Sequence, residues 1–265
     1  MRLFYKYFLL IFFLPLHFLS QEIDSSKIEC KYLITFLIDT ANTNTLKKEN
    51  ASLLIGTHTS LFKSDQKQIA DSLTLISVEK SVSNPVNGRI EINTSSVPTA
   101  KFKPEVLYSG GKITIYDEIS KEHYNFEAPN KIIWKFENET KIIQGYNCRK
   151  AISKYGNKLI TVWYTEQIPI QDGPYTFKGL PGLVLEAYDS KDYFHFSLMG
   201  LKKIKKPIGK LPFGIDTTYE KFYKKRKEKM DDPLGSFFNT FGRPAPKNSE
   251  ERIIKNIRSI NNFLD

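Results

Sequence analysis

Residues 173–184, the signature stretch of this chain, read Gly-Pro-Tyr-Thr-Phe-Lys-Gly-Leu-Pro-Gly-Leu-Val and continue as an apolar, strand-like segment. We expect a type II turn at residues 180–183, because Pro181 sets φ at the second position and Gly182 supplies the positive φ of the third. Gly179 lacks a side chain, so another backbone or an aromatic ring can approach it closely. The stretch therefore predicts a rigid turn that seats a buried strand or, alternatively, a backbone rim around a ligand.

Alternation of apolar and polar residues dominates on both sides of this turn. Residues 28–38 place apolar side chains at every second position, on one face of a long first strand. Residues 65–76 fit either a short helix or an irregular connection. Shorter strand-like segments follow at residues 113–117, 123–127, 132–137, 146–154, 159–165, 183–188 and 193–199. We predict a mostly-β fold with a curved, half-barrel-like antiparallel sheet, because so many strands must curl or be covered.

The pattern changes after residue 200. Residues 217–230 predict a basic helix, and Ser249 caps a last helix whose isoleucines form one apolar stripe. Glycines and prolines in residues 234–248 predict an irregular linker between these helices. We therefore divide the chain into a signal peptide (residues 1–20), a β domain (residues 21–200) and a short C-terminal helical addition, packed on or tethered to the sheet (residues 201–265).

Residues 1–20 have the parts of a secretory signal peptide. Arg2 and Lys6 form the basic start, residues 8–19 form the apolar core, and the last residue is small. The apolar run is shorter than the roughly 20 residues that a membrane-spanning helix needs, and Pro15 interrupts it. We therefore expect an exported chain, in the periplasm in the first place and otherwise at the cell surface or secreted.

The chain is basic, with a formal net charge of +10, which falls to +8 when Arg2 and Lys6 are removed with the signal peptide. The positive charges concentrate in residues 202–206 and 221–229. Such runs are most often a solvated basic face, but they also suit an anionic membrane surface or an acidic glycan. No nucleic-acid-binding motif is present, so we expect no nucleic acid partner.

Two cysteines, Cys30 and Cys148, remain after cleavage. An even pair in an oxidising compartment predicts one disulfide bond between them. The alternative is a pair of buried thiols. Neither cysteine has a histidine or an aspartate close to it in sequence, so nothing indicates a catalytic thiol.

Several motifs between residues 143 and 198 occur together in a fixed order. They are Ile-Gln-Gly-Tyr-Asn-Cys-Arg-Lys-Ala (143–151), Val-Trp-Tyr-Thr (162–165), Ile-Pro-Ile (168–170), Gly-Pro (173–174) and Gly-Leu-Pro-Gly-Leu (179–183). In these motifs the chain resembles the GLPGLI family of exported bacterial proteins, with Val184 in place of the usual isoleucine. Weaker likeness extends the resemblance to most of residues 28–200.

The resemblance implies a periplasmic protein of a bacterium with an outer membrane, and it supplies no mechanism. The strand pattern is also similar to the half-barrel sheets of periplasmic lipoprotein carriers. That similarity is an analogy of fold, which does not determine function.

Reactive side chains form no recognisable catalytic motif. His58, His123 and His195 lie on separate segments, and none has the spacing of a metal-binding pair. The candidates for a glycosidase-like carboxylate pair are Glu166, Asp172, Glu186 and Asp189. We interpret them as solvated loop acids and expect no catalytic residue, no metal and no cofactor.

Aromatic residues supply most of the candidate binding residues. Trp163 and Tyr164 follow each other on a predicted strand, so one faces the core and the other faces the opposite surface. Tyr193 and His195 share the face of their strand that points away from the neighbouring phenylalanines. The predicted binding set is Trp163, Tyr164, Tyr193, His195, Gly179 and Gly182.

The sequence supports three functional hypotheses. The first is a non-enzymatic carrier that binds an apolar ligand, lipid-like or peptide-like, on the concave face of the sheet. The second is an interaction module of an envelope assembly, with the basic helix against a protein partner or an anionic membrane surface. The third is a peptide or glycan hydrolase that uses the loop carboxylates. We favour the first, because the predicted sheet is long and curved and no reactive group stands out.

Overall fold

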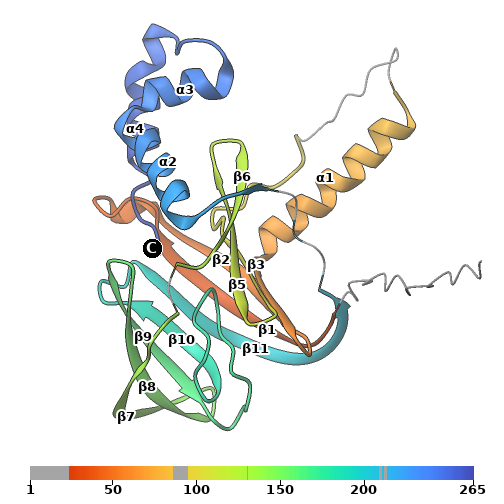
Figure 1. Ribbon diagram of the computed structural model, residues 1–265, viewed down its shortest axis with the longest axis vertical. Helices are drawn as coiled ribbons and strands as arrows, with labels where there is room; N and C mark the ends of the chain where they lie inside the picture. Colours follow the sequence, from red (N-terminus) through yellow and green to blue (C-terminus); the bar gives the residue numbers. More distant parts are fainter. Residues whose placement is uncertain (1–23, 86–94, 130, 209–210, 212–213) are drawn as a thin grey trace, which may run out of the picture.

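The computed structural model describes residues 24–85, 95–129, 131–208, 211 and 214–265 (Figure 1). The signal peptide predicted at residues 1–20 lies outside the described residues. The strands are β1 (Ser25–Leu37), β2 (Leu46–Ile55), β3 (Thr59–Ser64), β4 (Glu105–Ser109), β5 (Lys112–Ile119), β6 (Glu122–Glu127), β7 (Lys135–Ile143), β8 (Tyr146–Tyr155), β9 (Lys158–Thr165), β10 (Leu183–Asp189), β11 (Phe194–Pro207) and β12 (Ile215–Asp216). The helices are α1 (Asp65–Ser83), α2 (Tyr219–Asp231), α3 (Pro233–Phe241) and α4 (Glu250–Arg258).

The strands of the described residues form one 12-stranded sheet in the order β12-β6-β5-β4-β3-β2-β1-β11-β10-β9-β8-β7. Strands β1 to β6 form one meander and β7 to β11 form a second, and the two join where β1 pairs with β11. The pairs are antiparallel apart from β12 with β6, which is parallel. The sheet is open and strongly bent (Figure 1). The prediction of a mostly-β, curved antiparallel sheet with C-terminal helices is confirmed.

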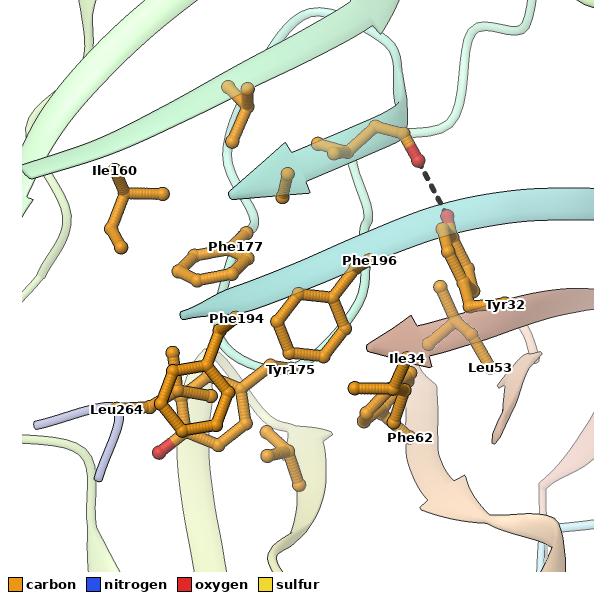
Figure 2. Close-up of a cluster of buried hydrophobic side chains, with 14 of the residues drawn as sticks. Tyr32, Ile34, Leu53, Phe62, Ile160, Tyr175, Phe177, Phe194, Phe196 and Leu264 are labelled. Atoms are coloured by element: carbon orange, nitrogen blue, oxygen red, sulfur yellow. Dashed lines mark hydrogen bonds between the residues drawn. The ribbon is translucent and has the colours of Figure 1, made fainter. Parts of the chain in front are cut away.

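The core fills the inside of this bend. On β1 the predicted alternation is present, with Cys30, Tyr32, Ile34 and Phe36 buried on one face. Figure 2 shows the aromatic side chains that meet them from distant parts of the chain, including Phe62, Tyr175, Phe177, Phe194 and Phe196. The Tyr32 hydroxyl donates a hydrogen bond of 2.6 Å to the carbonyl oxygen of Val184. Burial of such large apolar side chains, each worth about 1.5–3 kcal/mol, holds the two meanders together.

Helix α1 follows β3 without a loop. Its N-cap is Ser64, whose hydroxyl accepts a hydrogen bond of 3.3 Å from the backbone N–H of Lys67. The connection at residues 65–76 is therefore helical, and the helix continues to Ser83. Figure 1 shows α1 extending away from the sheet. Among the helices described, none is long and apolar enough to cross a membrane.

The linker predicted at residues 234–248 is wrong in its first half, where the chain forms α3. Residues at both ends of α3 are helix-end signals, and one of them, Gly242, is among those that suggested irregular structure. Pro233 occupies the first turn, and the Asp232 carboxylate caps it by accepting a hydrogen bond of 2.9 Å from the Gly235 N–H. Gly242 ends the helix in the left-handed conformation, with φ +67°.

The predicted disulfide is absent, because Cys30 and Cys148 are free, buried thiols. Cys30 lies on β1 and Cys148 on β8, and the sheet order places β11, β10 and β9 between them. Neighbouring strands are about 4.8 Å apart, so four strand spacings along the sheet exceed the roughly 6 Å between Cα atoms that a disulfide spans. Burial raises the pKa of the Cys30 thiol to about 12, which keeps it protonated and unreactive.

Strand β11 extends through the basic run at residues 202–206. Two of these lysines face a carboxylate that is almost fully buried: Lys202 and Lys206 lie 3.1 and 3.5 Å from the oxygens of Glu29. Lys31 lies 3.7 Å from the same carboxylate. Part of this run therefore compensates a buried negative charge and is not simply a solvated basic face.

Candidate functional site

The signature stretch is inserted into the core. Tyr175, Phe177 and Leu180 are buried among the aromatic side chains of the sheet. The predicted type II turn is wrong, because Gly179 has the positive φ of +84° and Gly182 does not have a positive φ. Gly182 is required for a close approach instead, since a Cβ there would lie 2.5 Å from the carbonyl carbon of Thr165. The two glycines thus exchange the roles that the sequence suggested.

A buried ion pair stabilises the signature stretch. The Lys178 ammonium binds the Asp172 carboxylate and donates a hydrogen bond of 3.1 Å to Ser60 Oγ. Asp172 Oδ1 also accepts a hydrogen bond of 2.7 Å from the Gly173 N–H, and Trp134 Nε1 donates one of 2.9 Å to the carbonyl oxygen of Lys178. Asp172 is 7% exposed, so the interpretation of this residue as a solvated loop acid is wrong. Its role here is structural.

A cavity of about 530 Å³ lies between the inner face of the sheet and the C-terminal helices. Much of its wall is apolar, and includes Phe36, Ile115, Ile119, Phe126, Phe194 and Leu264. Figure 2 shows Tyr175, which also lines the cavity, beside Phe194 and Leu264. Helix α2 closes one side through Phe222, whose ring stacks on Phe126 with 4.6 Å between centroids. The space is thus built jointly by the sheet, the signature stretch and the C-terminal addition.

Charged groups gather in one part of the cavity wall. The Arg226 guanidinium lies 2.6 and 2.7 Å from the two carboxylate oxygens of Asp265, so this pair is satisfied. Asp117 comes from β5 and makes a hydrogen bond of 2.7 Å with the Glu118 N–H. Lys229, one turn after Arg226 on α2, also lines the cavity. An apolar chamber with a few convergent polar groups is the usual form of a small-molecule site.

Asp117 occupies the position of an apolar residue. On β5 it shares a face with Ile115 and Ile119, both of which are buried, and it is itself half-buried where it lines the cavity. Desolvation raises its pKa to about 7, and the hydrogen bond from the Glu118 N–H and the nearby Arg226 guanidinium offset this effect only in part. At neutral pH the cavity therefore holds a carboxyl group that is protonated in a large fraction of molecules.

The raised pKa of Asp117 makes stability depend on pH. In the unfolded chain the carboxyl loses its proton near pH 4, but in the folded chain it keeps the proton up to about pH 7. The unfolded state thus binds fewer protons between these values, and the free energy of unfolding decreases as pH rises through this window. We expect the Asp117→Asn variant to remove about 2 kcal/mol of the wild-type loss between pH 5 and pH 8.

Denaturant unfolding at pH 5 and pH 8 measures this effect. The matched control is Glu127→Gln, at an exposed carboxylate on the neighbouring strand β6. Its pH dependence should equal that of the wild type. An equal loss of stability in wild type and Asp117→Asn would contradict the assignment.

The predicted binding residues lie away from this cavity, and none of the six lines it. Tyr164 faces the core, while Trp163 lies on the opposite face of β9, where Lys141 Nζ is 4.4 Å from its ring centroid. Tyr193 is half-buried beside the end of β1, and its carbonyl oxygen accepts a hydrogen bond of 3.0 Å from the Leu37 N–H. The two glycines belong to the signature stretch, in which Gly182 is buried and Gly179 is exposed.

His195 lies between two carboxylates on the outer face of the sheet. Its Nε2 is 2.9 Å from Glu186 Oε1 and its Nδ1 is 2.7 Å from Asp192 Oδ1. The hydrogen bond with Glu186 raises the pKa of His195, and Asp192 adds to the effect. Lys141 also binds Glu186, and Tyr188 packs against the imidazole with 5.2 Å between ring centroids. The cluster satisfies its own charges and leaves no free acid or base at its centre.

The carboxylates considered for hydrolysis do not meet at one place. Glu186 points to the outer face, whereas Asp172 is paired in the core. Glu166 forms an exposed ion pair of 3.0 Å with Arg149, and Asp189 accepts a hydrogen bond of 2.6 Å from the Phe194 N–H. In the described part of the chain, no group of three or more His, Cys, Asp or Glu side chains is arranged to hold a metal ion.

Sequence reasoning missed the cavity residues Asp117, Arg226 and Asp265. One signal was available for Asp117, because an acid interrupts the alternating isoleucines at 113, 115 and 119. A second lay in the basic helix, where Tyr219, Phe222 and Arg226 recur at helical spacing on one face. Nothing in the sequence linked Asp265 to Arg226, which lies 39 positions away.

The fold and the cavity define a class: an open, bent antiparallel sheet whose inner face is covered by C-terminal helices over an apolar chamber. A family model described as a protein of unknown function (Porph_ging) matches residues 153–186, which include the signature stretch. No curated protein matches the chain.

Two solved structures of PNGF-II are similar in fold. The P21 form aligns with a TM-score of 0.50 at 15% identity, over 75% of this chain and 32% of that chain. The C2 form aligns with a TM-score of 0.48 at 16% identity, over the same shares. This chain therefore spans about a third of the length of the structures it matches. At such identity the likeness concerns the fold alone.

Proposed function

We propose that this protein is a non-enzymatic binding or carrier protein that holds an apolar small molecule in the cavity between the sheet and helices α2 and α4. The observation that carries the proposal is the chamber itself. Its volume of about 530 Å³ lies in the range of about 300–1,000 Å³ typical of ligand pockets. The ligand is lipid-like or peptide-like, as the sequence suggested, but its site is at the helical end of the concave face.

The cover of the cavity supports release as well as binding. Helix α4 has no buried residue, and α2 buries only Phe222 and Arg226. The cover therefore rests on few apolar contacts, and segments of this kind open at low free-energy cost. A carrier needs such a movable part, since a fully enclosed ligand must leave without unfolding the sheet.

We further propose that the protein works in the cell envelope, in the periplasm in the first place. The basic residues of α2 would then meet an anionic membrane surface, where each lysine near the surface contributes about 1 kcal/mol. Phe238 and Phe241 on α3 are 51% and 48% exposed, which favours an additional contact with an envelope protein. Crosslinking of the full chain in its host tests that second role.

Filling the cavity should abolish binding of a neutral apolar probe. We expect the double variant Met230→Trp/Ile257→Trp to weaken binding of N-phenyl-1-naphthylamine at least about tenfold, because both side chains line the chamber and tryptophan occupies the space of the ligand. The measurement is a fluorescence titration, with melting temperature as a check of folding. Ile254→Trp on the same helix α4, which does not line the cavity, is the control and should bind as the wild type does.

Equal probe binding by the filled variant and the wild type would exclude this chamber as the site. Native mass spectrometry of protein purified from its host complements the titration. A bound molecule that is recovered intact supports a carrier, whereas a cleaved product would favour the hydrolase hypothesis.

A further inference from the structure

We propose that the ligand is a single-chain amphiphile with an anionic head group, and that Lys229 binds this head group. This inference rests on the proposed function, because it concerns the polar part of the same cavity. It derives from the charges of the groups that line the chamber, and in particular from those that have no partner of opposite sign.

Most charges of the cavity wall are already compensated. Arg226 forms its ion pair with Asp265, and Lys103 lies 2.7 Å from Glu118. Desolvation raises the pKa of Asp117 to about 7, so this carboxyl is mostly neutral at pH 6. Two lining lysines, Lys101 and Lys229, make no ion pair with any residue that the structure describes. The wall therefore carries excess positive charge when Asp117 is protonated.

Lys229 is the better placed of these two lysines. It follows Arg226 by three positions on α2, so both side chains lie on the helix face that covers the chamber. Lys229 is half-buried, whereas Lys101 is exposed. Burial lowers the pKa of Lys229, and the attraction of the Glu118 carboxylate, which is itself paired with Lys103, offsets this loss of hydration only in part. A bound anion would supply the remaining counter-charge.

The remaining groups fit a carboxylate or phosphate head. Protonated Asp117 is a hydrogen-bond donor, and so is the hydroxyl of Tyr155, a residue that is 3% exposed. Both residues line the chamber. The apolar wall on Phe36, Ile115 and Phe126 would hold the chain of the amphiphile. An anionic head and one apolar chain thus match the two halves of the site.

The test is displacement of N-phenyl-1-naphthylamine at pH 6 by palmitate, by 1-palmitoyl-lysophosphatidate and by the neutral analogue hexadecanol. We expect the wild type to bind at least one of the two anions about tenfold or more tightly than hexadecanol, the gain typical of one charge-assisted hydrogen bond. Lys229→Gln should remove this preference and leave hexadecanol binding unchanged, and Lys229→Arg should restore it. Lys227→Gln, at an exposed lysine on α2 outside the cavity wall, is the matched control and should behave as the wild type.

The two anions distinguish a fatty acid from a lipid phosphate as the natural head group. The inference is overturned if hexadecanol binds as tightly as both anions, or if Lys229→Gln keeps the preference. In those cases the apolar site itself would still stand. If none of the three amphiphiles displaces the probe from the wild type, both the inference and the proposed function fail.

Discussion

Lys178→Met should lower the free energy of unfolding by about 3–5 kcal/mol, the cost of leaving a buried charge without its partner. Lys178 and Asp172 are 8% and 7% exposed, so water cannot replace the lost ammonium. The variant would retain the volume of the side chain but leave the Asp172 carboxylate with only the Gly173 N–H as a hydrogen-bond donor in the signature stretch. Urea denaturation of the full chain measures the effect.

The double variant Asp172→Leu/Lys178→Met separates charge from packing. With both charged groups replaced by apolar ones of similar size, the loss should shrink to less than about half that of Lys178→Met. Lys154→Met, at an exposed lysine on β8, serves as the surface control and should change stability by less than about 0.5 kcal/mol. If Lys178→Met were no worse than this control, the ion pair would have no structural role.

Gly182→Ala should destabilise the fold by about 3 kcal/mol or more. The new Cβ would overlap the Thr165 carbonyl group, and backbone atoms cannot move aside as the end of a flexible side chain can. Thr165 pairs with Leu183 in the β9–β10 ladder, so relief of the overlap would separate these strands where the signature stretch enters the sheet. Thermal and denaturant unfolding would both report the loss.

Gly179→Ala gives the contrasting result. A Cβ at Gly179 meets no atom within 4 Å, so only the left-handed backbone conformation is strained. That strain costs about 1–2 kcal/mol, less than the overlap at Gly182. A larger loss of stability in Gly179→Ala than in Gly182→Ala would contradict these roles and would favour the type II turn that the sequence predicted. Gly200→Ala, which meets no atom within 4 Å and has no positive φ, is the neutral reference.

These variants also connect stability with the proposed binding. Tyr175 belongs to the signature stretch and lines the cavity, so a shift of this stretch would change the shape of the chamber. Conversely, a ligand that binds only the folded state should raise the melting temperature, and the rise should grow with the logarithm of ligand concentration above the Kd. The cavity-filling variant and the signature-stretch variants can therefore be ranked with one thermal assay.

Patterns of local sequence were sufficient for most elements. Alternation at residues 28–38 predicted the buried face of β1, because side-chain direction in a strand has a period of two. The same rule predicted β8, β9 and β10. The pattern of residues 217–230 predicted α2, and the Thr218 hydroxyl caps its first turn. The prolines and glycines near α3 were misjudged, because these residues signal helix ends as strongly as they signal loops.

The candidate site could not be predicted from local sequence patterns. Asp117, Tyr155 and Arg226 come from β5, β8 and α2, and only the bend of the sheet and the return of the chain after α4 bring them to one chamber. The role of Gly182 depended on the position of Thr165, a neighbour in space across the β9–β10 pairing. Cys30 and Cys148 looked suitable for a bond only while the order of the strands was unknown.

By itself, the sequence determined which segments become strands and helices, because period, caps and turn residues act over a few positions of the chain. The tertiary structure alone decided which strands are neighbours and that the Cys30 and Cys148 thiols lie apart. It also decided that Asp117, Arg226 and Lys229 line one apolar cavity. The physical reason is that the order of strands in the sheet and the desolvation of charged groups depend on contacts between residues far apart in the sequence. A local sequence pattern does not specify those contacts.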